Sequence, residues 1–359
     1  MAAASSTVPG WCISSANRCR SERASTPSAA SRPYVPPVPP RRGPAPVTDS
    51  QLRFLDRAQG ESLFLAAALV ALLGNAVVVD RSAHAAQSFG GGRVLELPGV
   101  DLNVREYGPP GDRAVVLLHG YSASIEWWQP VAEKLAAAGQ RVIAIDLIGH
   151  GGSEAPRDAA EYGARGQSTA IRQALSALGV RHAVLVGHSM GGAVAAAVAE
   201  AEPGVVDRVV VSDTPGDNGL TAVPVMRDVV CAPVIGPAAD RFRAIDAVDT
   251  SSLQTGFAAD YPVPDFAYRS LQRLTHTGVC DSDVVDDLNA DKAIADRLAG
   301  LGKPVLVIWG ERDVLTPTAG NVARYTEAGL PPHVIAGSGH SPMVEKPDEF
   351  VSAIKDFVS

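Results

Sequence analysis

Short apolar runs alternate with helix-like stretches from Arg93 to the end of the chain. The predicted strands are 94–97, 103–107, 114–118, 142–145, 183–186, 209–211, 305–309 and 334–335. From residue 114 onward these runs are short and mostly lack polar alternation, which is typical of parallel strands buried on both faces. Helical patterns lie between them, for example over 128–138, 166–178, 191–201 and 321–327. This order predicts an α/β fold, in which helices cover a mostly parallel sheet.

One long interval, at about 216–302, separates two predicted strands. An interval of this length inside an α/β sheet is usually an inserted helical cap and not a structureless loop. Four aromatic residues within it would bury an apolar ligand group: Phe257, Tyr261, Phe266 and Tyr268. We therefore expect a globular domain over 93–359 that carries a cap at about 216–302.

The N-terminal region differs from this pattern. Residues 1–62 are rich in Ser, Ala, Pro and Arg without apolar periodicity, so we expect a disordered low-complexity region. An apolar run over 63–79 follows, and Ala83 and Ala85 then match a small-residue cleavage pattern. We interpret residues 63–85 as an export signal or membrane anchor, which predicts an exported or membrane-associated protein. A helix packed on the domain of a cytoplasmic protein is the alternative.

The length of the preceding segment leaves two explanations open. An ordinary export signal has far fewer residues ahead of its apolar run. A transit peptide could precede the signal, because the segment is rich in Ser and Arg and poor in acidic residues. Translation could instead start downstream, for instance at Val47. The sequence is compatible with both.

Composition narrows the class of protein. Hydrophobic residues make up 46% of the 359 residues, enough for a substantial core, and the net charge is −8. The first 50 residues carry six Arg and two acidic residues, a charge of +4, which leaves −12 for the rest. This balance argues against a dedicated nucleic-acid binder, which needs a basic surface. No CxxC or HExxH pattern is present, so we expect no metal site.

Four cysteines are too few for a disulfide scaffold. Two of them, Cys231 and Cys280, lie in the cap interval, and an exported protein would meet conditions in which such a pair can close. The alternative is that both are buried thiols. The sequence leaves this choice open, because it does not give the distance between the two Cα atoms.

The strongest local motif is Gly187-His188-Ser189-Met190-Gly191-Gly192, which joins the predicted strand 183–186 to an apolar helical run. A serine on a sharp strand-to-helix turn is held exposed above the sheet, and glycines permit the turn and the close approach of the helix. The N–H of Met190, at the start of the helix, would face developing negative charge. The motif therefore predicts Ser189 as a nucleophile.

A serine hydroxyl needs a base, and the order expected after this turn is serine, acid, histidine. Asp313 follows the predicted strand 305–309, and His340 follows 334–335. Catalytic groups gather at the carboxyl edge of a parallel sheet, so we predict that these two complete a triad with Ser189. Asp213, which also follows a strand, is the rival acid, and Glu311 is a weaker candidate.

The loop after the strand 114–118 reads His119-Gly120-Tyr121. Gly120 permits a tight turn, and the N–H of Tyr121 is the predicted second donor to the oxyanion. His119 stands at the strand end before the turn, which favours a structural hydrogen-bonding role. The glycine-rich loop over 146–153 lacks the lysine of a phosphate-binding loop, so we interpret it as a turn, with His150 at most near the pocket rim.

With these motifs in place, residues 93–359 resemble the α/β-hydrolase superfamily, and within it the capped serine hydrolases whose first loop reads His-Gly-x. The matching pieces are His119-Gly120-Tyr121, Asp146-x-x-Gly149-x-Gly151, Gly187-x-Ser189-x-Gly191, Gly310-x-x-Asp313 and Gly339-His340. The resemblance implies Ser189 as nucleophile, Asp313 as acid and His340 as base, with Tyr121 and Met190 as oxyanion donors. A serine nucleophile, where other branches have aspartate, speaks against the epoxide hydrolases and haloalkane dehalogenases.

These observations predict a serine hydrolase that works without a cofactor or metal. We expect it to cleave a small carboxylic ester with an apolar part through an acyl-enzyme. Hydrolytic C–C cleavage and perhydrolysis on the same residues are alternatives, as is a non-catalytic small-molecule receptor with the same fold. Substrate identity and oligomeric state are left open.

Overall fold

The computed structural model describes residue 43 and residues 48–80, 83–222, 230–232, 236–237 and 252–359. Most of the predicted low-complexity region, 1–62, lies outside these residues. So do several stretches of the predicted cap between 223 and 251.

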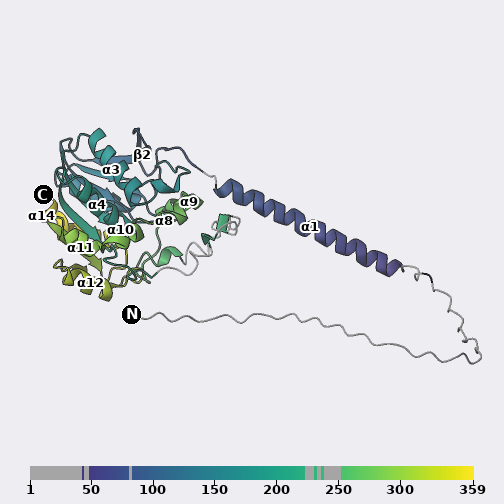
Figure 1. Ribbon diagram of the computed structural model, residues 1–359. Helices are drawn as coiled ribbons and strands as arrows, with labels where there is room; N and C mark the ends of the chain where they lie inside the picture. The colour runs from purple at the N-terminus through teal and green to yellow at the C-terminus, as the bar shows by residue number, and fades with distance from the viewer. Residues whose placement is uncertain (1–42, 44–47, 81–82, 223–229, 233–235, 238–251) are drawn as a thin grey trace, which may run out of the picture. The chain divides into compact units, whose positions relative to one another are not determined.

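An eight-stranded sheet forms the centre of the domain (Figure 1). Its strands are β1 (Arg93–Leu95), β2 (Leu102–Tyr107), β3 (Arg113–Leu118), β4 (Val142–Ile145), β5 (His182–His188), β6 (Val206–Ser212), β7 (Val305–Gly310) and β8 (His333–Ile335). Their order in the sheet is β1-β2-β4-β3-β5-β6-β7-β8. β2 pairs antiparallel with β1 and β4, and the other pairs are parallel. Every predicted strand is present, which confirms the mostly parallel sheet.

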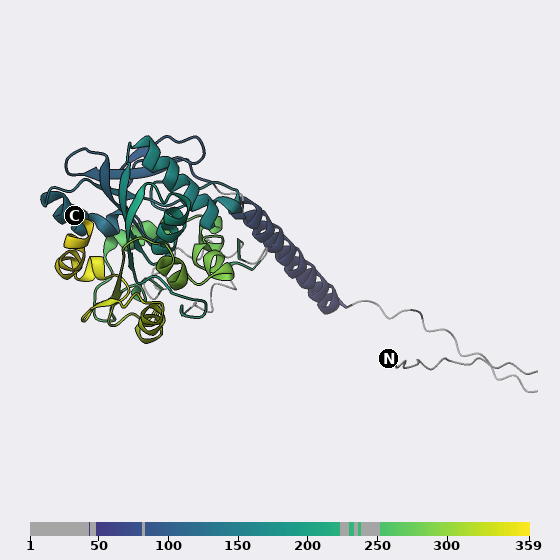
Figure 2. The same cartoon turned by 60° about the vertical axis from the view of Figure 1, so that its left-hand side comes forward.

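Helices cover both faces of this sheet (Figures 1 and 2). In the described part of the domain they are η1 (Ile125–Trp128), α2 (Gln129–Ala137), η2 (Ala159–Glu161), α3 (Ala164–Ala177), α4 (Met190–Ala201), α8 (Asp265–Gln272), α9 (His276–Cys280), α10 (Val284–Asp291), α11 (Ile294–Ala299), α12 (Thr318–Glu327), α13 (Pro342–Glu345) and α14 (Pro347–Val358).

The side chains of the central strands alternate between two apolar cores, because successive residues of a strand point to opposite faces. On β3, Val116 and Leu118 pack in the core that contains α3 and α4. Val115 and Leu117 pack in the core that contains α2 and α14. Since both faces are buried, the strand carries an unbroken apolar run, which is why the sequence shows it so clearly.

Helix α1 (Asp49–Asp80) contains the apolar run of the N-terminal region. It begins at Asp49, well inside the segment predicted as low-complexity, because residues 50–62 include Leu, Arg, Gln, Ala and Glu, which favour helix. The chain divides into two units, Met1–Gln59 and Gly60–Ser359, so α1 contributes to both.

Within the second unit, Leu63 and Phe64 of α1 have exposed side chains. Among the described residues, no helix combines enough length with enough apolar character to cross a membrane. The interpretation of residues 63–85 as an export signal or anchor stays a prediction.

The C-terminal part of the predicted cap belongs to the main body of the domain. Val284 of α10 and Ile294 of α11 are fully buried in the same apolar core as Val194 of α4. The boundary of the cap, expected at about 302, stays a prediction. The sequence shows the apolar spacing of these helices but not the surface against which they pack.

The aromatic residues of the cap interval also pack differently from the expected apolar pocket. Phe257 is fully buried and stacks on Trp127, with ring centroids 5.2 Å apart, and on Tyr261 at 5.6 Å. Phe266 meets the Trp127 ring edge-on at 5.8 Å. These rings contribute to the core of the α2 face, so Phe257 offers no free surface to a ligand.

Cys231 and Cys280 form a disulfide, with Cα atoms 5.5 Å apart. Of the two alternatives left open by the sequence, the structure contains the bridge. It joins a short segment at residues 230–232 to the end of α9.

Removing this bridge should lower stability. The two cysteines are 49 residues apart in sequence, and closing a loop of that size constrains the unfolded chain by on the order of 4 kcal/mol in the chain-entropy model. The double variant Cys231→Ser/Cys280→Ser should therefore unfold at lower urea concentration, with a free energy of unfolding about 2–4 kcal/mol below that of the parent. The control is Cys12→Ser/Cys19→Ser, which replaces the same number of cysteines without touching the bridge. Equal midpoints for the two double variants would contradict the prediction.

Candidate active site

Ser189 lies on the sharp turn between β5 and α4. Its backbone has φ 51° and ψ −120°, a conformation that L residues rarely adopt. A Cβ at position 187 would lie only 2.3 Å from the carbonyl oxygen of Gly191. Because Gly187 has no Cβ, the helix can start directly after the strand. Across residues 183–196, Ser189 is the single residue that is not buried. Ser189 therefore lies, partly exposed, on the strand-to-helix turn that the sequence predicted, and its role as nucleophile stays a prediction.

The two residues predicted to stabilise an oxyanion lie beside this serine. Met190 is the first residue of α4, where the helix dipole favours negative charge. Gly120 is so near that a Cβ on it would lie 3.0 Å from Cβ of Ser189, and Tyr121 is the next residue. The hydroxyl of Tyr121 donates to the carbonyl oxygen of Val279 at 3.1 Å, which ties this turn to α9.

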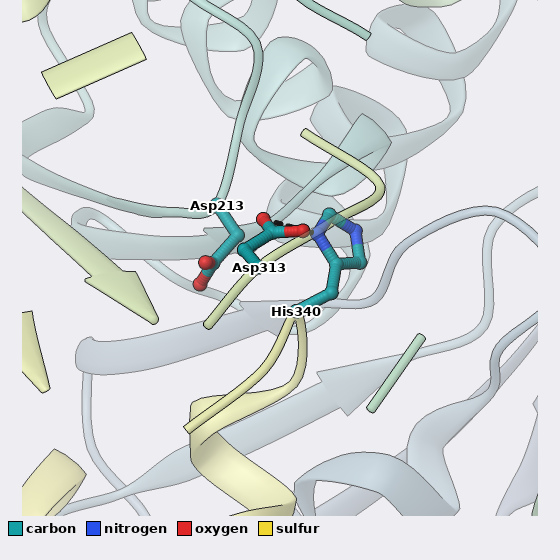
Figure 3. Close-up of side chains that lie close together, drawn as sticks. All are labelled: Asp213, Asp313 and His340. Carbon is teal, nitrogen blue, oxygen red and sulfur yellow. Dashed lines mark hydrogen bonds and ion pairs between the residues drawn. The ribbon is translucent and has the colours of Figure 1, made fainter. Parts of the chain in front are cut away.

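Asp313 and His340 form a buried pair (Figure 3). His340 Nδ1 donates to Asp313 Oδ2 at 2.8 Å. Burial raises the pKa of the Asp313 carboxyl, but the charge of His340 and the hydrogen bonds to the carboxylate outweigh it, so the net pKa lies below the ordinary value. Asp313 is therefore ionised and holds the imidazole in one orientation and tautomer, as a triad acid does.

Thr316 also belongs to this pair, and the sequence analysis missed it. Its N–H donates to Asp313 Oδ1 at 2.9 Å, and its hydroxyl donates to Asp313 Oδ2 and lies 3.2 Å from His340 Nδ1. The N–H of Leu315 donates to Asp313 Oδ1 at 2.8 Å. Aspartate side chains often accept from the N–H two residues on, as Asp313 does from Leu315, but this pattern does not mark Thr316 in the sequence.

Asp213, the rival acid, is buried next to the pair, but its carboxyl group points away from His340 (Figure 3). Its Oδ1 accepts from the N–H of Gly310 at 2.8 Å, and its Oδ2 accepts from the hydroxyl of Ser212 at 2.7 Å. Burial, and next the charge of Asp313, raise the pKa of Asp213 well above its ordinary value. With its carboxyl group in this orientation and both oxygens bound, Asp213 does not compete for the histidine.

The ligand atoms of Asp213, Asp313 and His340 lie within 4.8 Å of one another, a spacing that a metal ion could bridge. However, His340 Nδ1 already donates to Asp313, and both oxygens of Asp213 accept hydrogen bonds. These bonds fit an acid–base pair in which a carboxylate orients a histidine better than they fit a set of metal ligands.

The loop that carries His340 is fixed by Glu345, a second residue that the sequence did not reveal. The Glu345 carboxylate accepts from the N–H of Gly339 at 3.0 Å and of Ser341 at 3.2 Å, on either side of the histidine. It also accepts from the N–H of Ala258 at 3.0 Å. The backbone on both sides of the base is thus bound to one carboxylate, which also binds the cap segment at Ala258.

His119 has the structural role that the sequence predicted. It is fully buried, its Nε2 accepts from the N–H of Leu147 at 3.0 Å, and its Nδ1 donates to the carbonyl oxygen of Gly120 at 2.7 Å. His150 is buried as well, with Nδ1 3.0 Å from the carbonyl oxygen of Ile148, which is compatible with the predicted turn. Neither histidine is arranged as a second base.

Buried neutral histidines predict acid sensitivity. Burial lowers the pKa of His150 to about 4 and that of His188 to about 3, whereas an unfolded histidine titrates near about 6.5. The unfolded chain therefore binds more protons than the folded chain at acid pH. The folded state keeps its full stability above about pH 6.5 and loses part of it as the pH falls toward about 4. When the pH is lowered from 7.5 to 5.5, each of these histidines should lower the free energy of unfolding by about 1 kcal/mol.

Urea unfolding at the two pH values measures this loss. His150→Asn keeps a donor for the carbonyl of Ile148 but does not titrate, so its loss between pH 7.5 and 5.5 should be about 1 kcal/mol smaller than that of the parent chain. Identical losses for the variant and the parent would refute the assignment of a buried neutral imidazole.

Comparisons with known proteins bear on the family and the fold of this chain. The model of the alpha/beta hydrolase family matches residues 115–353. The chain is 29% identical to a monoacylglycerol lipase of Mycolicibacterium smegmatis, over 67% of this chain and 82% of that protein. It is 27% identical to a haloalkane dehalogenase of Mycobacterium marinum, over 68% and 84%.

Among solved structures, the enol-lactonase of Burkholderia xenovorans LB400 superposes with a TM-score of 0.61 at 21% identity, covering 74% of this chain and 99% of that one. At this identity the superposition supports the fold alone.

Proposed function

Because this chain belongs to the alpha/beta hydrolase family, we propose that it is a serine hydrolase that cleaves a carboxylic ester through an acyl-enzyme on Ser189. The observation that carries the proposal is the combination of a partly exposed serine at the start of α4 with a buried Asp313–His340 pair. A serine at this turn, where aspartate would serve a dehalogenase, favours the ester branch.

The proposed mechanism uses the residues of the chain alone. His340 Nε2 takes the proton of Ser189, whose oxygen attacks the ester carbonyl carbon. The negative charge on the carbonyl oxygen is stabilised by the N–H groups of Met190 and Tyr121. Asp313 holds Nδ1 of His340 and stabilises the imidazolium, which then protonates the departing alcohol. Water activated by His340 attacks the acyl-enzyme and releases the acid.

The substrate class rests on the same site. One relative, at 29% identity, is a monoacylglycerol lipase, and its name supports an acyl ester as the substrate of this chain. We propose a small ester with an apolar part as the substrate. The apolar part is an expectation from the sequence, and the buried Phe257 does not support it.

A fluorophosphonate probe tests the proposal directly. The purified protein should react covalently at Ser189, which peptide mapping identifies, and should hydrolyse members of a panel of acyl and aryl esters with many turnovers. Labelling that is absent, or labelling without turnover, would favour a small-molecule receptor with this fold. Turnover of diketones without ester hydrolysis would favour the C–C hydrolase alternative, and peracid formation from added hydrogen peroxide at a rate above that of ester hydrolysis would favour the perhydrolase alternative.

We also propose that residues 63–85 direct export or anchor the protein to a membrane. N-terminal sequencing of the protein from its native host should find a mature chain that starts near Ala86 if the segment is a cleaved signal. Full-length protein should sediment with membranes if the segment is an anchor. Full-length chain recovered in the soluble cytosolic fraction would refute both.

A further inference from the structure

His188, the residue immediately before Ser189, makes a hydrogen bond to the backbone of His340, the proposed base. Its Nε2 lies 2.7 Å from the carbonyl oxygen of His340, and the two rings are 4.8 Å apart between centroids. His188 is buried at the end of β5, and the Trp127 ring stacks against it at 6.3 Å. The bond joins the loop of the base to the turn of the nucleophile.

The chemistry of this bond fixes the tautomer of His188. A carbonyl oxygen only accepts, so Nε2 carries the proton and Nδ1 carries the lone pair. In the part of the chain that the structure describes, Nδ1 has no hydrogen-bond partner and is buried. A Cβ on Gly120 would lie 2.8 Å from it, which places this nitrogen against the oxyanion turn.

A buried acceptor without a partner destabilises a protein by about 1–3 kcal/mol, and an apolar side chain of similar size would avoid that cost. Stability alone therefore does not explain an imidazole at this position. Its one hydrogen bond in the described structure goes to the residue that we propose as the base. The role of the imidazole is therefore inferred from this hydrogen bond to His340.

We propose that His188 is a positioning residue, which fixes His340 relative to Ser189 through the hydrogen bond from Nε2 to the His340 carbonyl oxygen. Glu345 binds the backbone on either side of His340, but it does not connect this loop to the turn of Ser189. The hydrogen bond from His188 makes that connection. A displacement of a catalytic group by about 1 Å can cost on the order of 10²-fold in rate. This inference rests on the proposed serine hydrolase mechanism.

A matched pair of variants at position 188 tests the role. Gln and Met have similar length and shape, but only Gln carries a donor that can reach the carbonyl of His340. His188→Met should lower kcat for an ester about 10–100-fold, with KM within about threefold of the parent and fluorophosphonate labelling slowed in parallel. His188→Gln should keep kcat within about fivefold. Both should unfold at similar temperatures.

The control is His182→Met, which replaces the exposed histidine at the other end of β5 and should leave kcat and KM unchanged. If His188→Met does not fold, His188→Phe, which keeps a ring against Trp127, serves as the variant without a donor. Equal kcat for the variants with and without a donor, or a change in KM alone, would overturn the positioning role. Failure of the proposed function would appear separately, as ester hydrolysis that persists in Ser189→Ala.

Discussion

Ser189→Ala should lower kcat for ester hydrolysis by at least about 10³-fold and abolish fluorophosphonate labelling, because every covalent step of the proposed mechanism passes through the Ser189 hydroxyl. The fold should survive. The Ser189 N–H donates to the carbonyl oxygen of Ser212 at 2.8 Å, and the Ser189 carbonyl oxygen accepts from the Thr214 hydroxyl at 2.9 Å. Neither hydrogen bond involves the Ser189 side chain. KM, where still measurable, should change little.

The matched control is Ser176→Ala, which removes an exposed hydroxyl from α3 and should leave both kcat and labelling intact. Far-UV circular dichroism and the thermal midpoint establish that both variants fold. A folded Ser189→Ala protein that keeps most of its hydrolytic rate would disprove the assignment of the nucleophile. The residual rate expected from binding and oxyanion stabilisation alone is far lower than that of the parent.

The sheet was predictable because its strands are buried on both faces. A strand such as β3, enclosed between two apolar cores, must be apolar along its length, and this run is visible without a structure. The nucleophile turn was predictable for a related reason. Only small residues such as Gly187 and Gly191 fit where the helix starts directly after the strand, so the geometry is recorded in the residue types.

The contacts that hold the triad histidine were much less visible. Glu345 and His188 act on backbone groups of the His340 loop, and any loop offers such groups, so no residue type marks the partner. The choice between Asp213 and Asp313 was also open, because both follow strands that end at the same sheet edge. The direction of each carboxyl group depends on packing, and this the sequence does not specify.

The cap interval shows the same limit. The helix α10 has apolar residues at Val284 and Leu288, one turn apart, which indicate a buried face. Whether that face packs on a cap or on the main body depends on tertiary contacts, and the structure places it against α4. Likewise the sequence permitted the bridge between Cys231 and Cys280 but gave no distance between them.

Replacing each of the two carboxylates beside His340 by asparagine should lower kcat by very different amounts. Asp313→Asn should lower kcat by about 10³–10⁴-fold, because the amide can present its NH₂ group to Nδ1 and stabilise the wrong tautomer of His340. Asp213→Asn should lower kcat less than about tenfold. Burial and the charge of Asp313 raise the pKa of Asp213 and so disfavour its charged form, and an uncharged amide of the same shape therefore replaces it closely. Its oxygen can still accept from the N–H of Gly310.

Steady-state kinetics on both folded variants, with the thermal midpoint as a check on folding, distinguishes the two carboxylates. The variants are matched, since each exchanges one buried carboxyl oxygen for NH₂ within the same cluster. If Asp213→Asn were the inactive variant and Asp313→Asn the active one, the acid of the triad would have to be assigned to the end of β6. That result would require the Asp213 side chain to rotate toward His340 during turnover, giving up its bonds to Gly310 and Ser212. Because two buried hydrogen bonds would be lost in that rotation, the structure favours Asp313 as the acid.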